Sequence, residues 1–256
     1  MPRQQQPATR SVRRRSYDQF CATARSLDAV GDRWTLLIVR ELLAGPRRYT
    51  DLHADLPGVS TDVLASRLKD MEQSGLLTRR RLPPPAAASV YELTERGHGL
   101  LPVLAALAEW GAPALAERRP TDAVRAHWFA LPLLRALDGL THAGVVEVHL
   151  DEGEFHVRAG GAEAGARIED GVRAGAGAGV GIGIGVGGGV AEAAASGAPV
   201  AVYGDGPAAR PDARIALDVE VCLALGRGEL TLAEAVKDGR VEVSGEGPLA
   251  AEIRGE

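Results

Sequence analysis

"LPGVSTDVLASRLKDMEQSGLLTRRRL" (residues 56–82) joins a short amphipathic helix to a basic strand. The apolar residues of the helix recur at i, i+4 and i+7, which places them on one face: Leu64, Leu68 and Met71. At about 100° per residue, the opposite face carries small or polar side chains: Asp62, Ser66, Lys69 and Gln73. Ser60 or Thr61 can cap the start of this helix, and Gly75 can end it. We therefore predict a helix with one side packed on a core and a polar side turned outward.

The residues around this helix predict further helices and a hairpin. Residues 17–30 and 32–45 carry apolar stripes at helical spacing, and the second stripe includes Glu41. "YTDLHADL" (49–56) predicts a short third helix with Thr50 as its N-cap. After Gly75, "LLTRRRL" and "SVYEL" predict two strands around a proline-rich loop. This order of helices, turn and hairpin is that of a winged helix-turn-helix.

The outward face of the quoted helix and the basic strand together predict binding to double-stranded DNA. A helix enters the major groove most easily when its exposed side chains are small and polar, because its backbone can then approach the base edges. Arg79, Arg80 and Arg81 on the adjoining strand can reach phosphates or the minor groove. Side chains alternate along a strand, so Arg79 and Arg81 share one face and Arg80 points the other way. The alternative is a solvated helix beside a solvated basic hairpin.

A longer apolar helix is predicted after Thr94, over "ERGHGLLPVLAALAEWGAPALAERR", with Pro102 near its first turns. One face is built from small and aliphatic residues: Leu100, Leu104, Leu107 and Gly111. This face can pair with a second copy of the chain or pack on the chain's own second half. A homodimer would hold two reading helices about 34 Å apart, one DNA turn, and would suit a near-palindromic site.

The charge distribution divides the chain into two unlike halves. Residues 1–120 hold 18 basic and 13 acidic side chains, whereas residues 121–256 hold 11 and 21. This asymmetry favours contact of the first half alone with a polyanion, although the preference for Arg over Lys can also reflect a GC-rich genome. Residues 1–15 are basic and lack apolar residues, which predicts a disordered arm that either follows DNA phosphates or is simply solvated. Two cysteines, no secretory leader and no apolar run of about 18 residues predict a cytoplasmic protein without a membrane partner.

Residues 18–115 resemble the HxlR-type transcriptional regulators, winged-helix relatives of the MarR group. The resemblance rests on six short motifs: Gly31 with Trp34, Gly45 with Arg48 and Tyr49, Pro57-Gly58 with Ser60, Arg67-Leu68, Tyr91 with Leu93 and Thr94, and Trp110-Gly111. It implies homodimers that bind operator DNA. The DNA contacts that it implies here are Arg48, Ser60, Thr61, Asp62, Ser66, Arg67, Lys69, Arg79, Arg80 and Arg81. Cys21 occupies the place of a cysteine with which some members sense oxidants, so it is either an exposed reactive thiolate or a small buried residue.

Residues 121–256 predict a second, α+β domain. A helix over 121–137 and a hairpin from Val145 to Val157 are followed by a glycine-rich segment (171–190). The stretch from Ala213 to Glu246 resembles the end of sterol-carrier-protein-2-like domains, which implies helices packed on a twisted sheet around an apolar tunnel. The candidate residues of an apolar effector pocket are Trp128, Leu131, Leu134, Val221 and Leu225. The alternative is a domain that only supports the dimer, with a core filled by these same side chains.

No set of residues predicts catalysis, a cofactor or a metal site. The six histidines are scattered, although His149 and His156 flank the predicted hairpin turn as candidate cross-strand neighbours. The glycine-rich segment lacks the strand-turn-helix context of a nucleotide-binding loop. We therefore predict a non-enzymatic, DNA-binding regulator with a disordered arm (1–15), a winged helix-turn-helix domain with a dimerisation helix (16–120) and a sterol-carrier-like α+β domain (121–256). The rival function is a lipid carrier whose winged helix binds protein.

Overall fold

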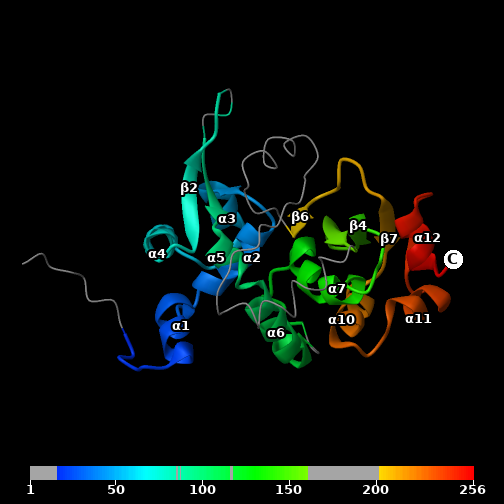
Figure 1. Ribbon diagram of the computed structural model, residues 1–256, viewed down its shortest axis with the longest axis horizontal. Coiled ribbons are helices and arrows are strands. Elements are labelled where there is room, and N and C mark those ends of the chain that lie inside the picture. The colour runs from blue at the N-terminus through cyan, green and yellow to red at the C-terminus, as the bar shows by residue number, and fades with distance from the viewer. Residues whose placement is uncertain (1–15, 85, 87, 116–117, 161–201) are drawn as a thin grey trace, which may run out of the picture.

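The computed structural model describes residues 16–84, 86, 88–115, 118–160 and 202–256. The predicted arm over 1–15 and the glycine-rich segment over 171–190 lie outside the described residues. The described helices and strands form two parts that lie side by side (Figure 1). No helix in these ranges is both long and apolar enough to cross a bilayer.

The first part is a winged helix-turn-helix, as predicted. Its helices are α1 (Ala22–Val30), α2 (Thr35–Leu43), α3 (Tyr49–Asp55), α4 (Thr61–Gln73), α5 (Glu95–His98) and α6 (Leu101–Gly111), followed by a 3-10 turn at Ala112–Leu115. Its strands are β1 (Arg47–Arg48), β2 (Leu77–Arg81) and β3 (Ser89–Leu93), and they form an antiparallel sheet in the order β1-β3-β2. The β2–β3 hairpin stands out from the helices as the wing (Figure 1).

Three helix boundaries differ from the prediction. The first helix begins at Ala22, five residues later than expected. The third begins at Tyr49, because the Asp51 carboxylate accepts a hydrogen bond from the backbone N–H of Arg48, which makes Arg48 the N-cap residue in place of Thr50. The long apolar helix is divided into α5 and α6. Pro102 cannot donate a backbone hydrogen bond to the preceding turn, and it therefore stands at the start of α6.

The second part is a five-stranded mixed sheet with helices packed on it. The strand order is β6-β5-β4-β7-β8, with β4 and β7 parallel and the other pairs antiparallel. The strands are β4 (Gly144–Leu150), β5 (Gly153–Ala159), β6 (Tyr203–Asp205), β7 (Ala213–Ala216) and β8 (Glu242–Ser244). The helices are a 3-10 turn at Ala126–Phe129, α7 (Ala130–Leu137), α10 (Val219–Arg227), α11 (Leu232–Lys237) and α12 (Pro248–Arg254). The expected α+β class is therefore present here, while the resemblance to sterol-carrier-protein-2-like domains stays a prediction.

The predicted hairpin is β4–β5, but its register separates the two histidines. Leu150 pairs with Gly153, so the turn lies one residue earlier than expected and His149 faces Glu154. His156 faces Glu147 on the neighbouring strand. The two histidines are therefore not opposite one another, because a hairpin turn sets the pairing of every later residue. His149 makes ion pairs with two carboxylates instead, those of Glu147 at 3.0 Å and Glu154 at 3.2 Å.

Buried apolar residues of both parts form one continuous cluster. It runs from Ile38 and Leu64 in the first part to Phe155 and Val221 in the second. Helix α6 packs against α7, and the N–H of Val202 donates to the carbonyl of Leu43 at 3.1 Å. The division into domains near residue 120 thus stays a prediction, and the two parts are joined by apolar and polar contacts alike.

Candidate nucleic-acid interface

One side of helix α4 packs on the core and the other side is exposed, as its sequence predicts. Leu64, Leu68 and Met71 are almost wholly buried. The exposed side carries the predicted small and polar residues Asp62, Ser66, Lys69 and Gln73, with Ala65 at its edge. Val63, an aliphatic residue that the sequence pattern did not place on the surface, is partly exposed on the flank. The small and polar side chains of the exposed side allow the helix backbone to approach a groove.

The start of α4 is fixed by two hydrogen bonds. The Ser60 hydroxyl accepts from the backbone N–H of Val63 at 3.4 Å, which makes Ser60 the N-cap and Thr61 the first helical residue. The Tyr49 hydroxyl, at the start of α3, donates to the carbonyl of Thr61 at 2.8 Å. The two helices of the helix-turn-helix are thus linked directly at the end of α4 that would enter DNA first.

The three arginines of the wing have different surroundings. Arg79 lies over the ring of Tyr91 at 5.9 Å and donates to the Ser89 hydroxyl at 3.3 Å. Arg80 points to the other face and pairs with Glu92 at 3.0 Å, which confirms the predicted alternation. Arg81 is exposed and forms no ion pair with any residue that the structure describes. Of the three arginines, Arg81 would break the fewest existing contacts on binding a phosphate.

The remaining predicted contacts also divide into paired and unpaired groups. Arg67 lies on the flank of α4, where it pairs with Asp32 at 3.3 Å and Asp70 at 2.8 Å. Lys69 and Arg48 are exposed, and neither forms an ion pair within the described ranges. The structure therefore places the polar face of α4 and the basic wing on neighbouring elements, and the contact of each residue with DNA stays a prediction.

Cys21 stands at the N-cap position of α1 and is exposed. The backbone N–H groups of Ala24 and Thr23 at the start of α1 lower the pKa of its thiol, because they stabilise the thiolate. Of the two predicted environments for Cys21, exposed or buried, the structure thus favours the exposed one. Redox sensing by Cys21 stays a prediction. The second cysteine, Cys222, is buried, and burial raises the pKa of its thiol.

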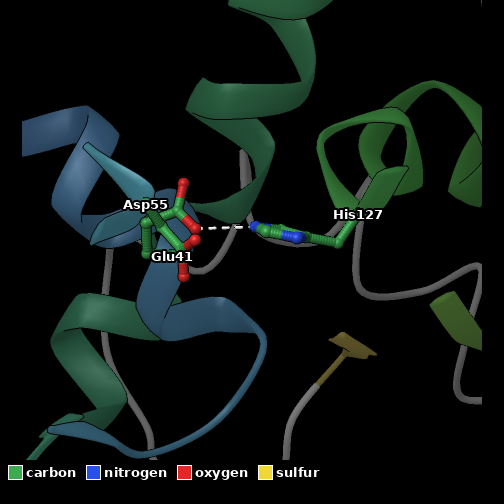
Figure 2. A group of neighbouring side chains, drawn as sticks. All are labelled: Glu41, Asp55 and His127. Carbon is green, nitrogen blue, oxygen red and sulfur yellow. Dashed lines mark hydrogen bonds and ion pairs between the residues drawn. The ribbon is translucent and has the colours of Figure 1, made fainter. Parts of the chain in front are cut away.

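A polar junction joins the helix-turn-helix to the second part, and the sequence analysis did not identify it. At its centre is the carboxylate of Glu41 on α2, which is 0% exposed. Oε2 of Glu41 lies 2.7 Å from Nε2 of His127 (Figure 2). Oε1 of Glu41 accepts from Nε1 of Trp128 at 2.9 Å. Arg40 adds an ion pair at 2.7 Å and stacks on the Trp128 ring at 4.2 Å. The one feature of the sequence that could have indicated this junction was an acidic residue, Glu41, within the apolar stripe of residues 32–45.

The electrostatics of Glu41 require the His127 ring to donate. Burial acts most strongly on this carboxyl and would raise its pKa, but the hydrogen bond from His127 and the charge of Arg40 outweigh it and lower the pKa of Glu41. The group is therefore a carboxylate at neutral pH and can only accept hydrogen bonds. The proton between these two residues must then lie on Nε2 of His127.

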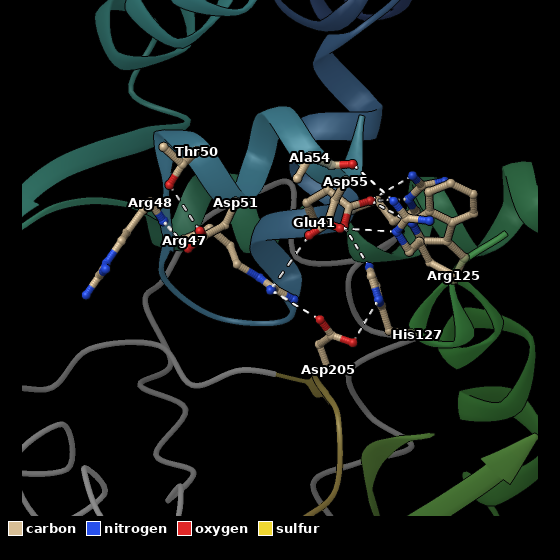
Figure 3. A network of polar contacts seen from close by, with 12 residues as sticks. Glu41, Arg47, Arg48, Thr50, Asp51, Ala54, Asp55, Arg125, His127 and Asp205 are labelled. Carbon is tan, nitrogen blue, oxygen red and sulfur yellow. Dashed lines mark hydrogen bonds and ion pairs between the residues drawn. The ribbon is translucent and has the colours of Figure 1, made fainter. Parts of the chain in front are cut away.

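The junction extends from Glu41 to the end of α3 and to β6 (Figure 3). Arg125 donates to Oδ1 of Asp55 at 3.4 Å and to the carbonyl of Ala54 at 3.2 Å. Arg47 lies between Asp55 and Asp205, at 3.8 Å and 3.5 Å. The hydroxyl of Tyr203, on β6, donates to the carbonyl of Arg40. Residues 125–128 and β6 thus hold α2, β1 and α3 at several points.

Glu41, Asp55 and His127 lie close enough together to hold a metal ion, but their surroundings do not suit one. One ligand atom of each lies within 4.8 Å of the other two. The two carboxylates already face the guanidinium groups of Arg40 and Arg125. A cation added there would replace existing charge pairs, so the cluster is better described as a salt-bridged junction.

The residues predicted to line an apolar pocket are part of the core. Leu131, Leu134, Val221 and Leu225 are buried in the continuous cluster, and Trp128 belongs to the junction. A cavity of about 290 Å³ does lie between the two parts, with Arg47, Asp51, His156, Tyr203 and Asp205 in its lining. Polar and apolar groups line it in similar proportion, and an apolar tunnel in the second part stays a prediction.

Comparison with known proteins gives matches over the first part of the chain. A family model described as an HxlR-like helix-turn-helix matches residues 29–119. The chain is similar to YvaP of Bacillus subtilis, an uncharacterized HTH-type transcriptional regulator, with 36% identity over 86 residues that cover 34% of this chain and 80% of YvaP. It is also similar to the HTH-type transcriptional regulator YodB of the same organism, with 36% identity over 81 residues covering 32% of this chain and 72% of YodB. The solved structure of reduced YodB covers 40% of this chain and 100% of its own, at 30% identity and a TM-score of 0.35.

Proposed function

The chain belongs to the HxlR-like helix-turn-helix family through residues 29–119, and on this premise we propose that it is a sequence-specific DNA-binding transcriptional regulator. The observation that carries the proposal is the exposed side of α4. Mostly small and polar side chains cover it, together with the exposed Val63, while Leu64, Leu68 and Met71 pack on the core. Relatives named as HTH-type transcriptional regulators support the same function.

In this proposal α4 enters the major groove and the wing lies along the backbone. Ser60, Thr61, Asp62, Ser66 and Lys69 face the groove, and Arg48, Arg67, Arg79, Arg80 and Arg81 contact phosphates or the minor groove. The unpaired arginines and Lys69 supply the charge for counterion release. The pairing of Arg80 with Glu92 and of Arg67 with Asp32 would be exchanged for contacts with DNA.

The proposal includes a homodimer on a near-palindromic operator. Exposed apolar side chains gather on the segment before α1, on α6 and on the 3-10 turn that follows it: Tyr17, Phe20, Val103, Leu107, Trp110 and Leu115. Surfaces of this kind are costly to expose to water and are typical of interfaces between chains. Two copies joined through α6 would bring two α4 helices to one side, with a separation near one DNA turn.

The proposal also includes modulation by an apolar small molecule bound in the second part, which we expect to be a sterol-carrier-like domain. Leu131, Leu134, Val221 and Leu225 would have to separate to admit such a ligand, because they are packed in the core. Purified dimer mixed with medium-chain fatty acids should then melt at a higher temperature, since a ligand that binds the folded state stabilises it. An unchanged melting temperature and DNA affinity would remove the apolar effector from the proposal.

The test of the proposed function is DNA binding by the full chain. We expect selection from a random-sequence duplex pool to enrich a near-palindromic motif, and fluorescence anisotropy to show affinity that falls steeply between 50 and 200 mM salt, as phosphate contacts require (about 10³-fold for six contacts). A single-stranded copy of the selected site serves as the control. Absence of duplex binding at low salt, or binding without a salt dependence, would contradict the proposal.

A further inference from the structure

The second part of the chain supplies the cap at the end of α3, the first helix of the helix-turn-helix. The last carbonyls of a helix have no partners within it and are usually satisfied by a glycine-based cap or by a basic side chain. The C-cap of α3 is Leu56, with φ −118°, so no left-handed glycine closes this helix. Arg125 reaches across instead and donates to the Ala54 carbonyl at 3.2 Å and to the Asp55 carboxylate at 3.4 Å (Figure 3).

Arg125 is itself held in place by the buried junction two residues further along. His127 and Trp128 bind the two oxygens of the Glu41 carboxylate on α2, at 2.7 Å and 2.9 Å. The His127 and Glu41 side chains are 1% and 0% exposed. A buried and fully hydrogen-bonded carboxylate allows little movement, because any displacement leaves a charge without its partners. Residues 125–128 are therefore fixed to α2 while Arg125 is fixed to the end of α3.

The end of α3 leads directly into the turn that sets the direction of α4. The turn contains Pro57 and Gly58, which has φ +85°, and it ends at the Ser60 cap. A shift at Asp55 would be carried into α4 by these few residues. The Tyr49–Thr61 hydrogen bond ties the other end of α3 to the start of α4. The orientation of the exposed side of α4 thus depends on both ends of α3.

From this geometry we infer that Arg125, His127 and Trp128 are positioning residues for DNA binding. They lie outside the helix-turn-helix, and they hold α3, and through it α4, in the orientation that DNA requires. The second part of the chain consequently acts on DNA affinity through this junction. This inference deepens the proposed function and rests on it.

The decisive variant is Arg125→Ala in the full chain. We expect its Kd for the selected duplex to rise about fivefold or more, which is the lower end of typical coupling between sites. The dependence of log Kd on log salt should keep its slope, because Arg125 neutralises no phosphate. Arg125→Lys should recover part of the affinity, since an ammonium group can still donate to the Ala54 carbonyl. Arg227→Ala is the matched control, because Arg227 belongs to the same half and pairs locally with Glu229.

A second measurement does not depend on DNA. Hydrogen exchange of residues 49–55 should become faster in Arg125→Ala than in the wild type and the Arg227→Ala control. Titration with excess protein gives the fraction of active molecules, so a loss from misfolding is separated from a change in Kd. If Arg125→Ala does not fold, Trp128→Phe replaces the indole by a smaller aromatic ring, removes the donor to Glu41 and should show the same two effects.

Three results would overturn the inference while the proposed function stands. The first is a Kd for Arg125→Ala within twofold of the wild type. The second is a salt slope smaller by about one, which would make Arg125 a direct phosphate contact. The third is unchanged hydrogen exchange in α3. Failure of the wild type to bind any duplex would instead contradict the proposed function, and hydrogen exchange would still show whether Arg125 holds α3.

Discussion

Nε2 of His127 lies 2.7 Å from Oε2 of Glu41, a residue 86 positions earlier in the chain, and both side chains are almost completely buried. One residue belongs to the second helix of a DNA-binding fold, and the other belongs to the segment that leads into the second part. Because a buried carboxylate that loses its hydrogen-bond donors is left with an uncompensated charge, this contact makes the two parts depend on one another for stability.

The Glu41→Ala variant should lose about 3 kcal/mol of unfolding free energy, the lower end for removal of one member of a buried pair. The reason is that His127 and Trp128 would both lose their acceptor in a buried site. Urea unfolding followed by circular dichroism measures the change. Glu109→Ala is the control, since the Glu109–Arg135 pair also joins the two parts but is 58% and 57% exposed, and should cost less than about 1 kcal/mol. Equal losses of unfolding free energy in the two variants would show that the burial of Glu41 does not increase its contribution to stability.

The Lys69→Ala and Arg67→Ala variants should weaken DNA binding in different ways. Lys69 is unpaired on the exposed side of α4, so its removal should lower the salt slope by about one if it contacts a phosphate. Arg67→Ala should also weaken binding, with part of the effect arising from its pairs with Asp32 and Asp70. Anisotropy titrations at several salt concentrations measure both, and Lys237→Ala on α11 is the control. Wild-type affinity in both variants would exclude α4 as the reading helix.

The Trp110→Ala variant should dissociate the proposed homodimer. Trp110 is 83% exposed on α6, and a large aromatic side chain at the centre of an interface is a typical source of binding energy. We expect the dissociation constant of the dimer to rise at least tenfold, which corresponds to about 1.4 kcal/mol. Sedimentation velocity over a concentration series measures it. A chain that is monomeric before any substitution would contradict the dimer itself.

The two cysteines should differ strongly in reactivity. Cys21 is exposed and the pKa of its thiol is lowered, so a larger fraction is thiolate at pH 7 than in an ordinary cysteine. Cys222 is buried, its thiol pKa is raised, and its sulfur lies 3.6 Å from the carbonyl of Phe129. Iodoacetamide should therefore label Cys21 in the native protein and Cys222 only after unfolding, as measured by mass spectrometry. Faster labelling of Cys222, or no labelling of Cys21, would contradict this assignment.

The Glu252 carboxylate should give the protein an acid-sensitive contribution to stability. The backbone N–H groups of Thr141 and His142 and the Thr141 hydroxyl lower the pKa of Glu252 from 4.5 to about 2. A pKa that is lower in the folded than in the unfolded state adds stability that is complete above pH 4.5 and is lost as the pH falls toward 2.

Glu252→Gln should thus be less stable than the wild type at pH 7, and the difference should shrink at pH 3. Urea unfolding at the two pH values measures it. Glu246→Gln, at an exposed position of the same half, is the control. A difference between Glu252→Gln and the wild type that stays constant with pH would show that the carboxylate is not selectively stabilised in the folded state.

The sequence by itself determined the elements whose cause is local. Apolar spacing identified the buried side of α4, and alternation placed Arg79 and Arg80 on opposite faces of the wing. The start of α4 was narrowed to Ser60 or Thr61, of which the structure makes Ser60 the N-cap. These features follow from the repeat of a helix or strand and from capping, which neighbouring residues specify. The N-cap of α3 and the register of β4–β5 differ from the prediction by one or two residues, whereas α1 begins five residues later than expected.

Only the tertiary structure decided how the two parts meet. Helical spacing put Glu41 among apolar residues, but nothing in its own segment shows that its partners are His127 and Trp128. The cap that Arg125 places on α3 is likewise a contact between residues about 70 positions apart. Such pairs arise because the sheet of the second part and the helices of the first share one core, and a local pattern carries no information about which distant side chain will face it.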